Sequence, residues 1–515
     1  MNQYSLARCG MLLVVASMPR IVFAALALPN PPAAPNIPSR TATLNGPADG
    51  VTDATAAINE AIEQLSAQGG GTLQFGAGTF LITVNPKNRD FAVQLESNVR
   101  LLGNSNGTTI KLANAQGPYN TMIGAPQHNN TALTLHDVDI ESITIDQNGV
   151  NNAIVSLADK LAGPKFAVRF AEGERFKVFG CTILNAAGVN TLDFTGGATD
   201  IEAGDNSFPN VGQPPGFYDF DVSTIYVHGA RVSVHNNTFT ARYGPGTTVA
   251  RTAIETHGDD ISVVNNTINA FSIGMIVTGQ AESSNRQLYQ GNVMNDIANG
   301  IEFRSEVYIN NSTQGMENIT IENNEVNLNP VVWRLTGKVS VAQPSEGIFI
   351  NPAPKDPAPI AGMAILNNTI TFPAVQGIPS SGDTNTGGVL FWTFFGLETP
   401  ITNLTISGNT ITNSLGAGIW TNMNLTGGTV VSDNLIVNPA RSSQFAAQTA
   451  IYMAGTAENI QITNNAVFNT TEPLIAVALS LIATCSSSCT ASGNKVNPVT
   501  IPLIIDGSGW TVSPP

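Results

Sequence analysis

Short apolar segments recur along the chain in one pattern. Two apolar residues separated by one position are followed by an asparagine and a further apolar residue, as in VSVHNNTF (232–239), ISVVNNTI (261–268), ITIENNEV (319–326) and MAILNNTI (363–370). The period of two within each copy predicts a half-buried β-strand, and the return of the pattern predicts a repeat architecture. The aligned asparagines, at a mean spacing of 32 residues, are Asn206, Asn237, Asn266, Asn292, Asn324, Asn368, Asn409, Asn434, Asn465 and Asn494.

Each of these asparagines is expected at a sharp turn between two short strands. Asn tolerates left-handed backbone angles and can hydrogen-bond nearby backbone groups. Stacked coil on coil, its amide can also bond the asparagines above and below, as identical side chains do in cross-β stacks. We therefore expect one continuous asparagine ladder.

A second strand lies between successive asparagines, and its register follows from an aliphatic position in every copy. Because side chains alternate between the two faces of a strand, the neighbouring positions point outward. The predicted fold class is all-β, a right-handed parallel β-helix that adds coils rather than cores. The predicted inward column is Leu192, Ile225, Ile254, Met275, Ile301, Ile348, Val389, Ile419 and Ile451.

The sequence also predicts how the chain is divided. Residues 1–27 have an apolar run ending in small residues and are expected to be a signal peptide, cleaved after Ala24 or Ala27. Residues 28–42 form a Pro-rich linker, and 43–112 form the N-terminal cap and first coils. A helix with Asp53 as N-cap is expected to cover the apolar end of the solenoid. Residues 113–500 are assigned to the β-helix and 501–515 to a C-terminal cap or tail.

The stretch 46–103, from GPADGVTDATAA to SNVRLLG, resembles the opening of the pectate-lyase superfamily of β-helices, which includes rhamnogalacturonase- and epimerase-like proteins. The usual pattern, DG-x-x-D-D-T-x-A followed by a Gly-rich turn and P-A-G-x-Y, is changed at Ala54, where Asp is usual, and at Gly76, where Pro is usual. The resemblance implies the fold. It leaves the reaction open, because this fold hosts lyases, hydrolases, epimerases and binding proteins.

Net charge and the positions of the cysteines indicate which partners and which cellular compartment to expect. The formal net charge of −15 disfavours binding to nucleic acid or anionic membranes, and no apolar run after residue 27 reaches the length of a membrane span. We expect a secreted or periplasmic protein. Cys485 and Cys489 are placed for a local disulfide in an oxidising compartment, or else remain two free thiols. Cys181 falls at a buried position and is interpreted as packing.

The predicted outward columns separate acidic from aromatic residues, as a glycan-binding groove requires. Candidate catalytic residues are Glu255, Asp193, Glu302, His257 and the loop acids Asp219 and Asp221. Candidate substrate-binding residues are Tyr226, His228, Arg304, Trp392, Trp420 and Tyr452. Long segments between the strands, such as 207–222 and 371–387, are expected to wall the groove.

Coil geometry allows a first test of this idea. Acids two coils apart, such as Glu255 and Glu302, are separated by roughly 10 Å, near the ~6.5–9.5 Å of an inverting glycosidase. Three of these residues also have simpler interpretations: Asp193 as a surface charge, Glu302 as an ion-pair partner of Arg304, and His257 as part of a structural ladder with His228.

Three function classes therefore stay open. The first is a glycoside hydrolase acting on a polysaccharide or oligosaccharide. The second is a polyuronide lyase or C5-epimerase, and the third is a non-catalytic glycan-binding protein or adhesin. No cofactor or metal is expected from the Cys and His spacing, except that Ca²⁺ could bridge an anionic substrate to the acids.

Overall fold

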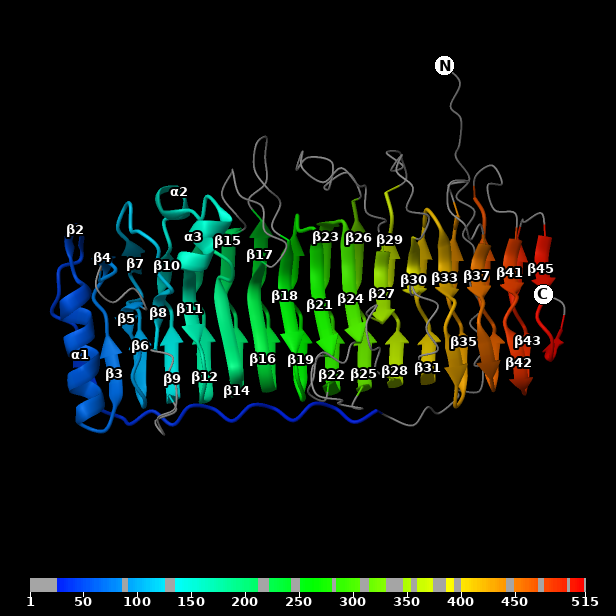
Figure 1. Cartoon of the computed structure of the whole chain (residues 1–515), viewed down its shortest axis with the longest axis horizontal. Helices are drawn as coiled ribbons and strands as arrows, with labels where there is room; N and C mark the ends of the chain where they lie inside the picture. Colours follow the sequence, from blue (N-terminus) through cyan, green and yellow to red (C-terminus); the bar gives the residue numbers. More distant parts are fainter. Residues whose placement is uncertain are drawn as a thin grey trace, which may run out of the picture.

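The computed structural model describes residues 26–85, 91–125, 135–211, 222–241, 251–279, 284–305, 315–329, 346–352, 359–373, 386–392, 400–440, 449–470, 477–497 and 501–513. The chain forms a right-handed parallel β-helix, which Figure 1 shows from the side as a row of stacked coils. All pairings between the strands of neighbouring coils are parallel, as the predicted fold class requires.

The first sheet carries the predicted inward and outward columns. The aliphatic positions from Leu192 to Ile451 pair coil by coil in the predicted register, and all nine are buried. The strands of this sheet are β5 (Phe91–Gln94), β8 (Thr121–Gly124), β11 (Phe166–Phe170), β14 (Leu192–Gly204), β16 (Ser223–His235), β18 (Thr252–His257), β21 (Ile273–Gly279), β24 (Asn299–Ser305), β27 (Glu346–Pro352), β30 (Gly387–Phe391), β33 (Ala417–Thr421), β37 (Thr449–Met453), β41 (Val477–Leu481) and β45 (Ile501–Ile505).

The second sheet is joined to the first through β14 and β16, which run through the corner as single long strands. Its other strands are β1 (Thr41–Thr43), β3 (Gly71–Gln74), β6 (Val99–Leu102), β9 (His136–Glu141), β12 (Glu174–Phe179), β19 (Ile261–Val264), β22 (Ser284–Gln290), β25 (Met316–Glu322), β28 (Ile360–Leu366), β31 (Pro400–Ser407), β35 (Thr429–Ser432), β39 (Ile460–Thr463), β43 (Cys489–Ser492) and β46 (Trp510–Val512). Three short strands extend it near the C-terminal end: β34 (Asn424–Thr426), β38 (Thr456–Glu458) and β42 (Thr484–Ser487).

The third sheet closes the solenoid, and from β15 onward each of its strands directly follows a ladder asparagine. Its strands are β2 (Asp49–Asp53), β4 (Gly78–Ile82), β7 (Thr108–Leu112), β10 (Thr144–Asp146), β13 (Thr182–Leu184), β15 (Ser207–Val211), β17 (Thr238–Ala241), β20 (Thr267–Asn269), β23 (Val293–Ile297), β26 (Glu325–Leu328), β29 (Thr369–Thr371), β32 (Thr410–Thr412), β36 (Leu435–Val437), β40 (Ala466–Phe468) and β44 (Lys495–Asn497).

The ten asparagines form the predicted ladder. From Asn237 through Asn494, each side-chain Oδ1 accepts hydrogen bonds of 2.9–3.1 Å from the backbone N–H and the amide of the asparagine one coil earlier. The Oδ1 of Asn206, the first of the ten, accepts a 2.9 Å hydrogen bond from the N–H of Cys181. One part of the prediction is wrong, because the ladder asparagines are not themselves left-handed. The residue before each of them takes positive φ: Asp205, Asn236, Asn265, Gly291, Asn323, Asn367, Gly408, Asp433, Asn464 and Gly493.

The N-terminal end is covered by helix α1 (Thr55–Ala67), which buries Ile58, Ile62 and Leu65. The N-cap position is Ala54 rather than the expected Asp53. The Asp53 carboxylate still serves the helix start, since it accepts a 2.9 Å hydrogen bond from the N–H of Thr55. Two short helices, α2 (Gly149–Asn152) and α3 (Leu157–Ala162), project from the solenoid between β10 and β11.

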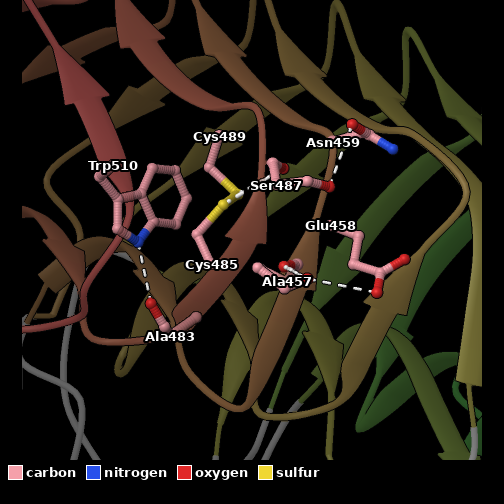
Figure 2. Close-up of a disulfide and its surroundings, with 9 residues drawn as sticks. Ala457, Glu458, Asn459, Ala483, Cys485, Ser487, Cys489 and Trp510 are labelled. Atoms are coloured by element: carbon pink, nitrogen blue, oxygen red, sulfur yellow. Dashed lines mark hydrogen bonds between the residues drawn. A yellow bond between two sulfur atoms is a disulfide. The ribbon is translucent and has the colours of Figure 1, made fainter.

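At the C-terminal end the coils continue through residues 501–512, where a cap or tail is expected, because β45 pairs with β41 and β46 with β43. Cys485 and Cys489 form the predicted disulfide, with 6.1 Å between their Cα atoms. Figure 2 shows it beside Trp510, whose indole N–H donates to the carbonyl of Ala483. Cys181 is buried and free as expected, and burial raises its pKa to about 12.

Candidate active site

The candidate site lies on the outward face of the first sheet. The predicted outward column is confirmed by the strand pairing and runs Asp193, Tyr226, Glu255, Ile276, Glu302, Phe349, Leu390, Trp420 and Tyr452. A second outward column lies two residues further along each strand. Its members His228, His257, Thr278 and Arg304 occupy paired positions in successive coils. This second column does not extend to β14, because the pairing of β14 with β16 is interrupted between Phe194 and Ala198.

Glu255 is held by side chains from two adjacent coils. The Ser223 hydroxyl donates to Oε2 at 2.5 Å, and His257 Nε2 lies 3.2 Å from Oε1. Burial raises the pKa of this carboxyl, but the hydrogen bonds and charges of His257, Ser223 and Arg251 outweigh burial and lower the pKa below its ordinary value. The side chain is 16% exposed, so Glu255 is an ionised carboxylate that a ligand on this face can reach.

Aromatic rings and imidazoles gather beside Glu255. The His257 ring lies 5.1 Å from the Tyr226 ring and 5.5 Å from the His228 ring. The imidazole of His257 is buried to 4% exposure, while Tyr226 and His228 are half-buried. Three sequence-predicted residues are therefore brought together around the fourth, Glu255.

Asp193 belongs to a different arrangement. Its Oδ2 accepts a 2.9 Å ion-paired hydrogen bond from Arg169 Nε, and its Oδ1 accepts one of 2.9 Å from the Asn190 amide. The Arg169 guanidinium lies 4.5 Å from the Phe166 ring centroid. Because Asp193 is only 2% exposed, its carboxylate holds the preceding coil in place and is not a surface charge. Ser223, Arg169 and Asn190 were missed by sequence reasoning, since they lie outside the columns.

Glu302 is paired with Arg304, whose Nε lies 2.8 Å from Oε1. Water does not reach Ile276, although this side chain lies in the outward column. Ile276 separates Glu255 from Glu302 in the column, and it is 2% exposed. The buried side chain of Ile276 therefore lies between the two acids, which are two coils apart, or roughly 10 Å.

The aromatic half of the face is a packed cluster. Phe349, Leu390 and Trp420 are buried, and Trp392 and Tyr452 lie partly exposed against them. The Trp420 ring centroid lies 6.5 Å from that of Trp392 and 5.7 Å from that of Tyr452. Trp420, expected as a binding platform, is 5% exposed because its neighbours in the stack cover it. Trp392 and Tyr452 are the rings that remain accessible.

Two predicted residues cannot be placed, since Asp219 and Asp221 lie outside the described residues. Most of the segments expected to wall the groove lie outside them too. Within the described part of the chain, no group of three or more His, Cys, Asp or Glu side chains is arranged to hold a metal ion. No helix in that part is long and apolar enough to cross a membrane.

Comparison with known proteins agrees with the parallel β-helix fold. Residues 43–276 match the family model of rhamnogalacturonase A/epimerase, pectate lyase-like proteins. The match covers just under half of the chain, and in that part the chain is similar to pectate-lyase-like proteins. The match confirms the resemblance carried by residues 46–103, despite Ala54 and Gly76.

Solved structures share this parallel β-helix fold. The tailspike protein of E. coli bacteriophage HK620, in complex with pentasaccharide, matches with a TM-score of 0.64 at 16% identity, over 90% of this chain and 77% of the tailspike. A mutant of the same tailspike in complex with hexasaccharide matches with a TM-score of 0.57 at 16% identity and the same coverage. At this identity the similarity concerns the fold.

A curated relative of the chain is known from Bacillus subtilis (strain 168). It is the SPbeta prophage-derived uncharacterized protein YomE, 31% identical over 140 residues. These residues make up 27% of this chain and 19% of the relative, so the chain spans about a fifth of that protein's length.

Proposed function

We propose that the chain binds a polysaccharide along the outward face of the first sheet and cleaves it as a glycoside hydrolase. The observation that carries the proposal is the setting of Glu255. It is partly exposed, it is hydrogen-bonded by Ser223 and His257, and its pKa is lowered, so it is ionised at neutral pH. An ionised carboxylate accepts the proton of an attacking water.

An inverting mechanism also needs an acid on the other side of the scissile bond. Glu302, two coils away at roughly 10 Å, fits that separation when its side chain leans toward Glu255. It would have to leave Arg304 to donate a proton. Asp219 and Asp221 are the alternative acids, as the sequence predicts.

Two further observations support the proposal that the ligand is a glycan. Trp392 and Tyr452 present accessible ring surface on the same sheet, and a sugar ring stacks on such surface. The tailspike structures with the same fold contain a pentasaccharide or a hexasaccharide. We also propose that the protein works outside the cytoplasm, which the Cys485–Cys489 disulfide supports.

A polyuronide lyase is the second candidate, and the ring cluster favours it. β-Elimination needs a base near C5 and a group that neutralises the sugar carboxylate. Beside Glu255, the His257 ring lies 5.1 Å from the Tyr226 ring and 5.5 Å from the His228 ring. Arg304 is the cation for the sugar carboxylate, although it is paired with Glu302.

The test is incubation of the full chain with neutral and anionic polysaccharides, with and without Ca²⁺. New reducing ends without the ultraviolet absorbance of an unsaturated uronate support hydrolysis, and that absorbance supports the lyase. Glu255→Gln should lower turnover by about 10²–10⁴-fold, while glycan affinity stays within a few-fold. Glu317→Gln, an exposed acid on the second sheet, is the matched control. Glycan binding without any cleavage contradicts both enzymatic proposals and supports a non-catalytic glycan-binding protein or adhesin.

A further inference from the structure

The second sheet carries a row of alternating charges along its outer corner. One residue per coil, just before the apolar part of the strand, takes positive φ between 53° and 57°. In six successive coils this position is occupied by Asp137, Arg175, Asp200, Arg231, Asp260 and Arg286. We call these six residues the Asp–Arg ladder.

Each aspartate of the ladder forms the same ion pair with the arginine of the next coil. Arg231 Nε donates to Asp200 Oδ1 at 2.7 Å and its Nη2 donates to Oδ2 at 2.6 Å. The pairs Arg175–Asp137 and Arg286–Asp260 repeat this two-bonded geometry within 2.6–2.9 Å. The aspartates are therefore oriented by rigid, fork-shaped partners.

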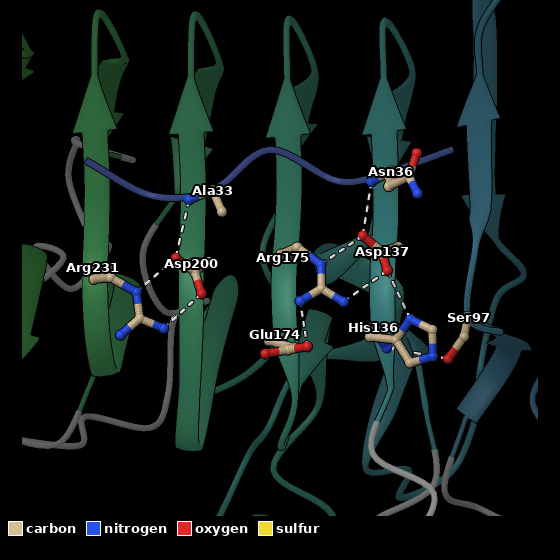
Figure 3. Close-up of polar contacts among 9 residues, drawn as sticks. All are labelled: Ala33, Asn36, Ser97, His136, Asp137, Glu174, Arg175, Asp200 and Arg231. Carbon is tan, nitrogen blue, oxygen red and sulfur yellow. Dashed lines mark hydrogen bonds and ion pairs between the residues drawn. The ribbon is translucent and has the colours of Figure 1, made fainter. Parts of the chain in front are cut away.

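The N-terminal Pro-rich segment, residues 26–36, lies along this ladder. The N–H groups of Asn36, Ala33 and Asn30 donate to Oδ1 of Asp137, Asp200 and Asp260, at 2.7, 3.0 and 2.9 Å. Figure 1 shows the segment crossing the coils from the α1 end, and Figure 3 shows its contacts with the first two aspartates. The segment expected as a linker is thus bound to the surface of the solenoid.

The spacing of these contacts matches two regular structures. The bonded N–H groups recur every third residue, and the half-buried positions between 26 and 36 recur at the same interval, at Leu26, Pro29, Pro32 and Pro35. Three residues of polyproline II advance ~9.3 Å, and two coils advance ~9.6 Å. Prolines occupy positions 29, 31, 32 and 35 but never 30, 33 or 36, where an N–H is needed.

We propose that the Asp–Arg ladder is a binding site for a proline-rich segment in the polyproline II conformation, and that residues 26–36 are its ligand within the same chain. A solenoid coil otherwise contacts only its neighbours. We call residues 26–36 the strap. The strap contacts every second coil, and it therefore couples the coils of β9, β14 and β19. The coils of Asp193, Tyr226 and Glu255 lie within this span.

The strap side offers a sharp test, because the ligand atoms are backbone N–H groups. Ala33→Pro removes one donor but keeps, and even favours, the polyproline II conformation. Ala34→Pro is the matched control, since it adds a proline at the next residue, whose N–H makes no hydrogen bond within the described part of the chain. A triple variant that combines Asn30→Pro, Ala33→Pro and Asn36→Pro removes all three backbone donors.

Hydrogen exchange of the full chain, followed by mass spectrometry, measures the coupling. In Ala33→Pro we expect peptides of the strap and of β14, β16 and β19 to exchange roughly tenfold faster or more, because a hydrogen bond to a charged group is lost. The triple variant should exceed that change, and Ala34→Pro should match the parent. Equal exchange in Ala33→Pro and Ala34→Pro overturns the proposal. This comparison decides the matter even when the triple variant does not fold.

Discussion

Glu255 and Asp260 lie five residues apart on one coil, yet they face outward from different sheets. Glu255 points from β18 into the candidate site. Asp260, the residue just before β19, accepts the hydrogen bond of Asn30 from the strap. The corner between them includes Gly258 at φ 118°, where a Cβ would lie 1.9 Å from the Gly229 carbonyl. The corner is therefore close-packed, and the site and the strap share one rigid coil.

Burial of the outward Ile276 leads to a prediction about folding. Ile301→Asp and Ile276→Asp should both lower soluble yield and melting temperature, because each places a carboxylate where water is excluded. Gln461→Asp, at an exposed position of β39, should change neither. Thermal unfolding of the three variants checks this. Retention of the parent melting temperature by Ile276→Asp would show that water reaches this position.

The asparagine ladder should be costly to interrupt. Asn266→Ala removes the hydrogen bonds to Asn237, Asn292 and the Val234 carbonyl, and it leaves buried donors and acceptors without partners. We expect a loss of about 3 kcal/mol or more in the free energy of unfolding. Asn327→Ala, a partly exposed asparagine of the third sheet, should cost about 1 kcal/mol or less. Denaturant unfolding of both variants measures the difference, and equal losses contradict this view of the ladder.

The two accessible rings should differ from the buried one in their effect on binding. Tyr452→Ala is expected to weaken glycan affinity roughly five- to tenfold with little loss of stability, because a stacking surface is lost. Trp420→Ala should destabilise the fold by about 3–5 kcal/mol, because it opens a cavity between Trp392 and Tyr452. Calorimetry with the glycan and thermal unfolding separate the two effects. A stable Trp420→Ala variant that has lost affinity would restore Trp420 as a binding platform.

Asp139 on the second sheet predicts a pH dependence of stability. Burial, and then the charge of Glu141, raise its pKa to about 7, although Arg100 lies 2.8 Å away and Lys177 faces it from the next coil. Since the folded pKa exceeds the unfolded value of ~3.9, ionisation opposes folding. The cost is absent below about pH 4, grows between pH 4 and 7, and is constant above pH 7.

Asp139→Asn keeps the side chain neutral at every pH. We expect it to stabilise the protein by up to about 4 kcal/mol at pH 8 and by much less at pH 4. Melting curves of the variant and the parent across this range are the measurement. A difference that does not vary with pH would mean that Asp139 does not titrate in this window.

The sequence was sufficient for the solenoid because the inward column is aliphatic in every coil. The positions from Leu192 to Ile451 define a register that one residue of slip would reverse, so the outward column followed from it. Burial within that column was not predictable in the same way. Ile276 and Trp420 are covered because of what lies beside them in the stack, which spacing alone does not reveal.

The strap and the ion pairs were harder to foresee for different reasons. The strap binds through backbone N–H groups, which leave no side-chain signature beyond the absence of proline at 30, 33 and 36. The alternation of Asp and Arg before successive strands was present in the sequence and could have been found by aligning the coils. Arg169, the partner of Asp193, lies on β11, one coil before the first copy of the inward column.

The match between strap and coils constrains how such a chain can change in length. Each coil repeats the same asparagine and the same inward position, so a whole coil can be duplicated or lost without rebuilding its neighbours. Between Asp137 and Asp260, however, a single added coil would place an arginine where the strap needs an aspartate. Coils in that span can be gained only in pairs, each pair with three more strap residues. Leu26 still lies against Gly362 on β28, so the solenoid is free to grow one coil at a time only beyond that coil. The evolutionary history of the solenoid should therefore differ between its two ends.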